Sequence, residues 1–155
     1  MCIDFLSRLF VIKYILNKPF NVSHTGNYVA CALSDEPVGI DIEQMRPSDQ
    51  KIAERFFTLD ERAYISANDS TASFYEIWTK KESRIKWEGR GLSKPLPSFS
   101  VFEPDTNEPN QPVYHRAFQN GETICHVCSA KQTELSVEIM DTAAFVIMAE
   151  EAFRA

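Results

Sequence analysis

Residues 71–87, with the sequence TASFYEIWTKKESRIKW, determine the fold prediction, because their apolar side chains recur every three or four positions. This spacing predicts one long helix with a buried side. Gly89 and Gly91 are expected to end it. The inward half of the helix is predicted to carry the following residues: Phe74, Ile77, Trp78, Lys81, Glu82, Ile85 and Lys86. The rest of the chain should therefore pack around this helix.

Strand signals lie on both sides of this helix. The branched apolar runs at residues 28–33 and 37–43, separated by Ser34-Asp35-Glu36, predict a hairpin, and Asn120-Gly121 predicts a second one. Shorter helices are expected at residues 48–57 and 58–65. The predicted class is α+β, an antiparallel sheet packed against a long helix. Residues 19–155 are predicted to form one domain, preceded by an atypical segment at residues 1–18.

Composition narrows the class of protein. With 155 residues, 44% of them apolar and 25% charged, the chain resembles an ordinary soluble domain. The net charge of -6 argues against a general nucleic-acid binder. The apolar run at residues 9–12 is too short to span a bilayer, so no membrane partner is expected. Four cysteines without a disulfide pattern favour a cytoplasmic location, and Cys125 and Cys128 are predicted to pack in a strand.

Two acids stand two positions apart on a predicted strand. Asp41 and Glu43 should project from one face, where two carboxylates repel each other unless a cation lies between them. Oxygen ligands of this kind suit magnesium. The alternative is that both acids are hydrated on an exposed face.

Glu82 adds a third acid, one helical turn before Lys86. It is expected to be either a magnesium ligand or a proton acceptor, with Lys86 neutralising a phosphate. The alternative is ordinary salt bridging along the helix.

Two further features suit a phosphate. Residues 21–26, NVSHTG, are predicted to form a turn whose donors converge, although Ser23 and His24 are neighbours and so do not suit a hydrolase triad. The stretch from Lys80 to Lys94 is net positive, which suits a phosphate or an acidic partner, or else a solvated helix face. Its cations are Lys80, Lys81, Arg84, Lys86, Arg90 and Lys94.

Three blocks together resemble the signature motifs of the Sfp-type 4'-phosphopantetheinyl transferases. They lie at residues 20–26, at residues 38–43, and at residues 74–93 from Phe74 through Lys81-Glu82-Ser83 to Gly91-Leu92-Ser93. The resemblance implies one half of a pseudo-dimeric α+β fold. It also implies the transfer of phosphopantetheine from coenzyme A to a serine of an acyl or peptidyl carrier protein.

The resemblance assigns roles to residues of this chain. Asp41, Glu43 and Glu82 match magnesium-ligating acids. The residues implied to contact coenzyme A are Ser23, His24, Lys81 and Lys86. Glu82 and Lys86 are the implied catalytic pair, the first accepting the proton of the carrier serine and the second stabilising the transferred phosphate.

The resemblance fails near the start of the chain, because only about twenty residues precede the Ser23-His24 block. One hypothesis is an active transferase that self-associates into a homo-oligomer to replace the missing half. A second is a non-catalytic remnant that binds carrier protein or coenzyme A weakly. A third is an unrelated magnesium-binding domain with phosphatase-like chemistry.

Overall fold

The computed structural model of the chain describes residues 18–48, 50–68, 70–102, 112–132, 134–139 and 141. The elements follow in this order: β1 (Phe20–Thr25), β2 (Tyr28–Leu33), β3 (Val38–Gln44), α2 (Gln50–Phe56), α3 (Leu59–Ala67), α4 (Ser70–Glu88), β4 (Tyr114–Asn120) and β5 (Thr123–Ser129). Two short 3-10 turns, η1 (Gly91–Ser93) and η2 (Leu96–Ser98), follow α4. The atypical segment predicted at residues 1–18 lies almost wholly outside the described residues.

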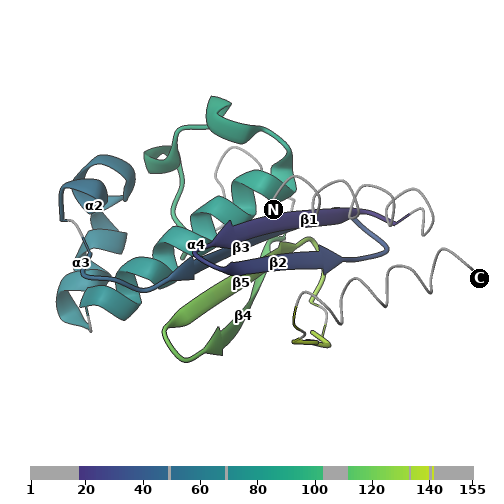
Figure 1. The fold of residues 1–155 in the computed structure, drawn as a ribbon. Coiled ribbons are helices and arrows are strands. Elements are labelled where there is room, and N and C mark those ends of the chain that lie inside the picture. Colours follow the sequence, from purple (N-terminus) through teal and green to yellow (C-terminus); the bar gives the residue numbers. More distant parts are fainter. Residues whose placement is uncertain are drawn as a thin grey trace, which may run out of the picture.

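The predicted α+β class is confirmed, with the strands divided between two sheets (Figure 1). β3, β5 and β4 form an antiparallel sheet in that order, and β1 pairs with β2 in a separate hairpin. The hairpin predicted around Asn120-Gly121 joins β4 to β5, with Gly121 at a φ of 57°. The long helix is confirmed as α4, and no helix in the described part of the chain is long and apolar enough to cross a membrane.

The predicted pairing of residues 28–33 with residues 37–43 is wrong. β2 pairs with β1 instead, from Thr25 opposite Tyr28 to Phe20 opposite Leu33. The reason is that Gly26, at a φ of 54°, makes a tighter turn with Asn27 than the three polar residues after β2 can make. Residues 21–25, predicted as a turn, are therefore strand β1.

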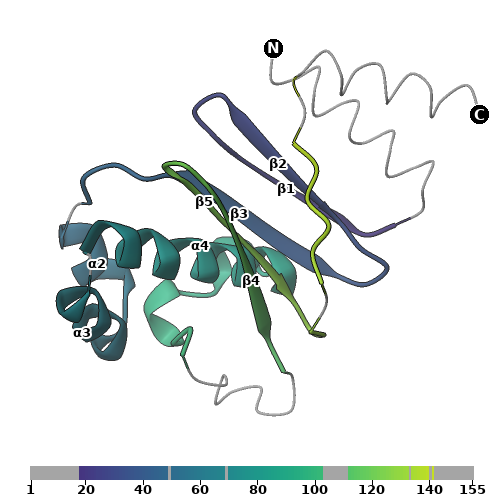
Figure 2. The same cartoon turned by 90° about the horizontal axis from the view of Figure 1, so that it is seen from below.

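α4 covers one face of the three-stranded sheet, and the β1–β2 hairpin lies against β3 (Figure 2). α4 lies on the face that carries Gly39, where a Cβ atom would be only 2.0 Å from the carbonyl oxygen of Ser83. The other face packs Ile40 and Ile42 of β3 against alanines of β2. The side chains of β3 at alternating positions therefore point toward α4, and Asp41 and Glu43 are among them.

Candidate functional site

Three alternate side chains of β1 hydrogen-bond to the free edge of β3. They form a ladder in which side-chain oxygens accept from backbone N–H groups: Ile40 N–H to Asn21 Oδ1 (3.1 Å), Ile42 N–H to Ser23 Oγ (3.4 Å) and Gln44 N–H to Thr25 Oγ1 (3.2 Å). The backbone of β3 pairs with β5 on its other edge. Polar side chains thus take the place of a neighbouring strand, and they bring the first sequence block against the second.

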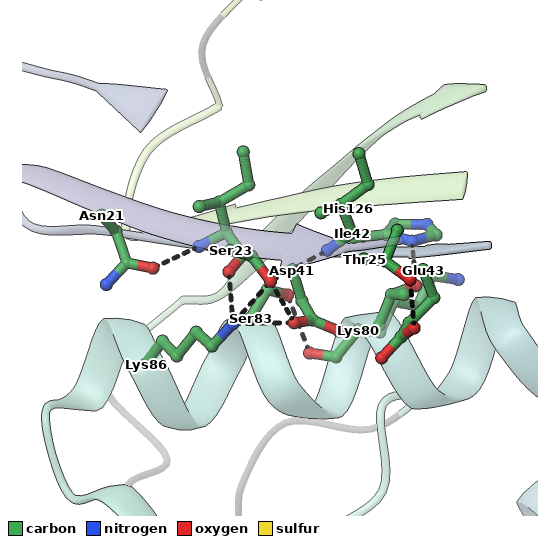
Figure 3. A network of polar contacts seen from close by, with 12 residues as sticks. Asn21, Ser23, Thr25, Asp41, Ile42, Glu43, Lys80, Ser83, Lys86 and His126 are labelled. Carbon is green, nitrogen blue, oxygen red and sulfur yellow. Dashed lines mark hydrogen bonds and ion pairs between the residues drawn. The ribbon is translucent and has the colours of Figure 1, made fainter. Parts of the chain in front are cut away.

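Asp41 lies at the centre of the site, with only 4% of its surface exposed. Its Oδ1 atom accepts from the Ser23 hydroxyl at 2.8 Å and from the Lys86 ammonium at 2.7 Å (Figure 3). Lys86 also donates to Ser23 Oγ and to the Ile40 carbonyl, both at 3.0 Å. One residue from each of β1, β3 and α4 therefore meets at a single carboxylate oxygen.

The second oxygen of Asp41 has no partner among the described residues. Asp41 Oδ2 is buried, and no described side chain or backbone group donates a hydrogen bond to it. Burial raises the pKa of this carboxyl, while Lys86 and Ser23 act in the opposite direction. A buried acceptor without a donor is costly, and a cation at Oδ2 would remove that cost.

Glu43 is half-buried, and one hydroxyl donates to it. The Thr25 hydroxyl lies 3.1 Å from Glu43 Oε2, and the Trp78 side chain on α4 is close enough to lower the pKa of the carboxyl. Burial and the nearby charge of Asp41 both raise the pKa of Glu43.

Glu82 lies on α4, one turn from Lys86 and one turn from Trp78. Burial raises its pKa, and the charges of Asp41 and Glu43 raise it further. The three acids are thus close enough to repel one another. Within the described residues, however, no three His, Cys, Asp or Glu side chains already form a group able to hold a metal ion. Binding a cation here would require rotation of at least one carboxylate.

Ser23 and His24 lie on opposite sides of β1, as strand geometry requires. Ser23 is buried against β3, where its hydroxyl donates to Asp41 and accepts from Lys86. His24 is exposed on the other side. The structure therefore places Ser23 in one group with Asp41 and Lys86, and it leaves His24 outside this group.

Lys81 is also outside the group, contrary to its assignment as a coenzyme A contact. Its side chain has no exposed surface and forms an ion pair of 2.9 Å with Glu61 of α3, which is equally buried. It also donates to the carbonyl oxygens of Leu96 and Phe99. The physical reason is that α4 is covered on two sides, and Lys81 faces α3 and η2 while Lys86 faces the sheet. We leave Lys81 out of the proposed site.

Most cations of residues 80–94 form ion pairs with acids of the same fold. The alternative of a solvated basic helix face is therefore wrong for these cations. The ion pairs are Lys80 with Glu76, Lys81 with Glu61, Arg84 and Lys94 with Glu88, and Lys86 with Asp41. Of these cations, Lys86 is the one that reaches the acids of β3.

Cys125 and Cys128 lie in β5 with buried thiols, as the sequence predicts. Burial raises the pKa of each thiol to about 12. Both therefore behave as packed side chains at neutral pH.

The sequence placed Asn21 and Thr25 in a predicted phosphate-contacting turn, and it connected neither of them, nor Trp78, with the acids of β3. The signal was present in the alternation of polar residues at positions 21, 23 and 25, which is typical of a strand with one polar face. Because residues 21–26 were interpreted as a turn, this alternation was not read as a strand. The sequence assigned Trp78 only to the inward half of the helix. Helical spacing alone does not show which side chains of β3 a residue of this half approaches.

Comparison with known proteins gives the family. The model of the 4'-phosphopantetheinyl transferase superfamily matches residues 37–144. The chain belongs to this superfamily. The Sfp transferase of Bacillus subtilis (strain 168) is 51% identical over 85 residues, which are 53% of this chain and 38% of that protein. The gsp transferase of Aneurinibacillus migulanus is 38% identical over 133 residues, or 76% of this chain and 55% of the relative.

A third transferase, AcpT of Salmonella typhimurium, is 43% identical over 76 residues, which are 45% of this chain and 40% of that protein. The matched region thus covers between 38% and 55% of the length of these three relatives. The resemblance to Sfp-type transferases is confirmed, and the matched residues include the acids of β3 and the Lys86 helix.

Proposed function

We propose that this chain transfers the 4'-phosphopantetheine group from coenzyme A to a serine of an acyl or peptidyl carrier protein, with release of adenosine 3',5'-bisphosphate. The observation that carries the proposal is the meeting of Ser23, Asp41 and Lys86, which joins the three sequence blocks at one carboxylate oxygen. The family match and the transferase names of the relatives support it.

The acids suit a divalent cation, for which we propose magnesium. Asp41 Oδ2 is buried and has no donor among the described residues. Burial raises the pKa of Asp41, Glu43 and Glu82, and the charge of Asp41 raises it further for the two glutamates, so each acid would gain from a nearby positive charge. When bound, magnesium would offset the negative charge of the coenzyme A pyrophosphate. These three residues are the proposed ligands.

The remaining roles fall to the chain's own side chains. Lys86 supplies a positive charge next to Asp41, and we propose that it stabilises charge on the transferred phosphate. Glu82 lies one helical turn from Lys86, and its carboxylate is the group that we propose accepts the proton of the carrier serine. We propose that Ser23 acts beside Lys86 and that His24 contacts coenzyme A from the exposed side of β1.

We further propose that the chain self-associates through the outer face of the β1–β2 hairpin. Val29 and Leu33 of β2 are 40% and 50% exposed there. The strand partner of Val29, His24, lies on the same face and is exposed as well. Apolar side chains gathered on one exposed face favour an interface with a second copy. The free buried thiols of β5 suit the cytoplasm, the compartment we propose for the chain.

The test is a mass assay on a carrier protein. The purified chain is incubated with magnesium, coenzyme A and an apo carrier protein, and the carrier should gain the mass of one phosphopantetheine group. Asp41→Asn and Lys86→Met should each lower the rate by at least about 100-fold. Glu54→Gln is the matched control, because Glu54 is an exposed acid of α2 outside the site.

A full-length relative run in parallel shows that the carrier is competent. No mass gain at high concentrations of this chain, while the relative modifies the carrier, would overturn the proposed activity. Coenzyme A binding retained under those conditions would then favour the non-catalytic alternative.

A further inference from the structure

Each acid of β3 lies between a hydroxyl of β1 and a possible donor of α4. Asp41 accepts from the Ser23 hydroxyl and the Lys86 ammonium. Glu43 accepts from the Thr25 hydroxyl, and the Trp78 indole of α4 is near enough to lower the pKa of its carboxyl. The two hydroxyls are two residues apart on β1, and the two α4 donors are eight residues apart, with Glu82 midway between them. The arrangement around Asp41 is thus repeated around Glu43 with donors that carry no charge.

Glu43 needs such donors more than Asp41 does. Its longer side chain has an additional rotatable bond, it is only half-buried, and the charge of Asp41 repels it. Without donors, repulsion would favour rotamers in which the Glu43 carboxylate turns away from Asp41 into solvent. The Thr25 hydroxyl and the Trp78 indole therefore keep the two carboxylates on one side of β3.

Both donors are themselves held in place. Thr25 Oγ1 accepts from the Gln44 N–H at 3.2 Å, which fixes the direction in which its own hydrogen points. The Trp78 ring packs against three phenylalanine rings of α2, α4 and the residue after α2, with centroid distances of 5.9 Å to Phe56, 6.2 Å to Phe57 and 6.2 Å to Phe74. A donor with little freedom loses little entropy when it orients an acceptor.

We infer that Thr25 and Trp78 are positioning residues that orient the Glu43 carboxylate for a divalent cation shared with Asp41. This inference rests on the proposed function, because it assumes that these acids hold the metal. Donors of this kind next to metal ligands typically change metal affinity by about 10- to 100-fold when they are removed.

The test measures metal binding directly. Mn²⁺ is titrated into the chain with and without coenzyme A, and the free ion is followed by electron paramagnetic resonance. Thr25→Val removes the hydroxyl and keeps the branched side chain, and Trp78→Phe removes the indole N–H and keeps an aromatic ring. Each should weaken Mn²⁺ binding about 10-fold. Thr25→Ser keeps a hydroxyl and should bind Mn²⁺ like the wild type.

A double-mutant cycle separates positioning from a general structural effect. If Thr25 acts through Glu43, Thr25→Val should have almost no further effect on Mn²⁺ binding once Glu43→Gln is present. Additive losses would overturn the inference, as would wild-type Mn²⁺ affinity in both Thr25→Val and Trp78→Phe. If the wild-type chain itself bound no Mn²⁺ even with coenzyme A, the proposed metal site would fail first and this inference with it.

Discussion

At position 39 only glycine fits, because α4 lies too close to β3 for any side chain. An added Cβ atom would lie 2.0 Å from the Ser83 carbonyl oxygen and 2.5 Å from the Trp87 nitrogen, both of which are backbone atoms. Backbone atoms within a helix cannot rotate aside as the end of a flexible side chain can. This glycine therefore sets how closely β3, with its two acids, approaches the helix that carries Glu82 and Lys86.

Gly39→Ala should accordingly lower the free energy of unfolding by about 3 kcal/mol or more, measured by urea denaturation. Gly121→Ala is the comparison, because nothing lies within 4 Å of a Cβ there. That substitution should cost only the strain of the positive φ, about 1–2 kcal/mol. Equal stability of the two variants would contradict the close packing of β3 on α4.

Lys81 is expected to stabilise the fold, in contrast to the coenzyme A contact that the family resemblance implies for it. Lys81→Met should lower the free energy of unfolding by about 3–5 kcal/mol, because it leaves the buried Glu61 carboxylate without its cation. Lys80→Met is the matched control, since Lys80 pairs with Glu76 in a partly exposed position and its loss should cost no more than about 1 kcal/mol.

Adding Glu61→Gln to Lys81→Met should restore part of the stability, because no uncompensated charge then remains buried. If Lys81→Met instead left the denaturation curve unchanged and weakened coenzyme A binding, Lys81 would belong to the site after all.

At the scale of elements, the face of the sheet beneath α4 carries two neutral histidines. His126 of β5 lies 2.7 Å from the Thr79 hydroxyl of α4, and the rings of His115 and His126 are 6.4 Å apart. Burial lowers the pKa of His115 to about 3 and that of His126 to about 4, and nearby cations of α4 lower both further. Both side chains stay uncharged in the folded chain at neutral pH.

Stability should therefore fall as the pH drops below about 6.5, the ordinary histidine pKa. In this range the histidines are protonated in the unfolded chain and neutral in the folded chain. Each histidine therefore lowers the free energy of unfolding by up to about 1.4 kcal/mol for each pH unit of acidification. Asp41, Glu43 and Glu82 act in the opposite sense, because their raised pKa values favour protonation of the folded chain. Urea denaturation between pH 7.5 and 4.5 measures the sum.

The histidine part is isolated by a double variant, His115→Gln with His126→Gln. Its free energy of unfolding should depend less steeply on pH than that of the wild type. An unchanged slope would show that these two side chains are not the source.

The elements also show which parts of the structure the sequence could predict. α4 and the capped start of α3 follow from local signals, since apolar spacing and the reciprocal bonds of Thr58 and Glu61 depend only on near neighbours. The pairing of β2 with β1 depends instead on a competition between two turns. Lys81 and Lys86 have different partners because α3 and the sheet cover different sides of α4. Their spacing of five residues does not show which side each element covers.

At the scale of the whole molecule, exposed apolar side chains on the outer face of the β1–β2 hairpin make self-association testable. Light scattering at increasing protein concentration should give the mass of a dimer or larger oligomer. Val29→Lys and Leu33→Asp should shift the chain toward monomer, because each buries a charge at the proposed interface. Leu59→Asp is the control, since Leu59 is 78% exposed on α3, away from the hairpin. A monomer at every concentration would rule out this interface.

The ladder between β1 and β3 has a consequence for how the site can be observed. The amide protons of Ile40, Ile42 and Gln44 are held by side-chain oxygens of β1, whereas a regular sheet would hold them with backbone carbonyls. Two of those oxygens, on Ser23 and Thr25, also bond to the carboxylates of Asp41 and Glu43. The hydrogen–deuterium exchange rates of these amides are thus coupled to whatever the acids bind. They give the chain an intrinsic, residue-resolved reporter of occupancy that needs no attached label.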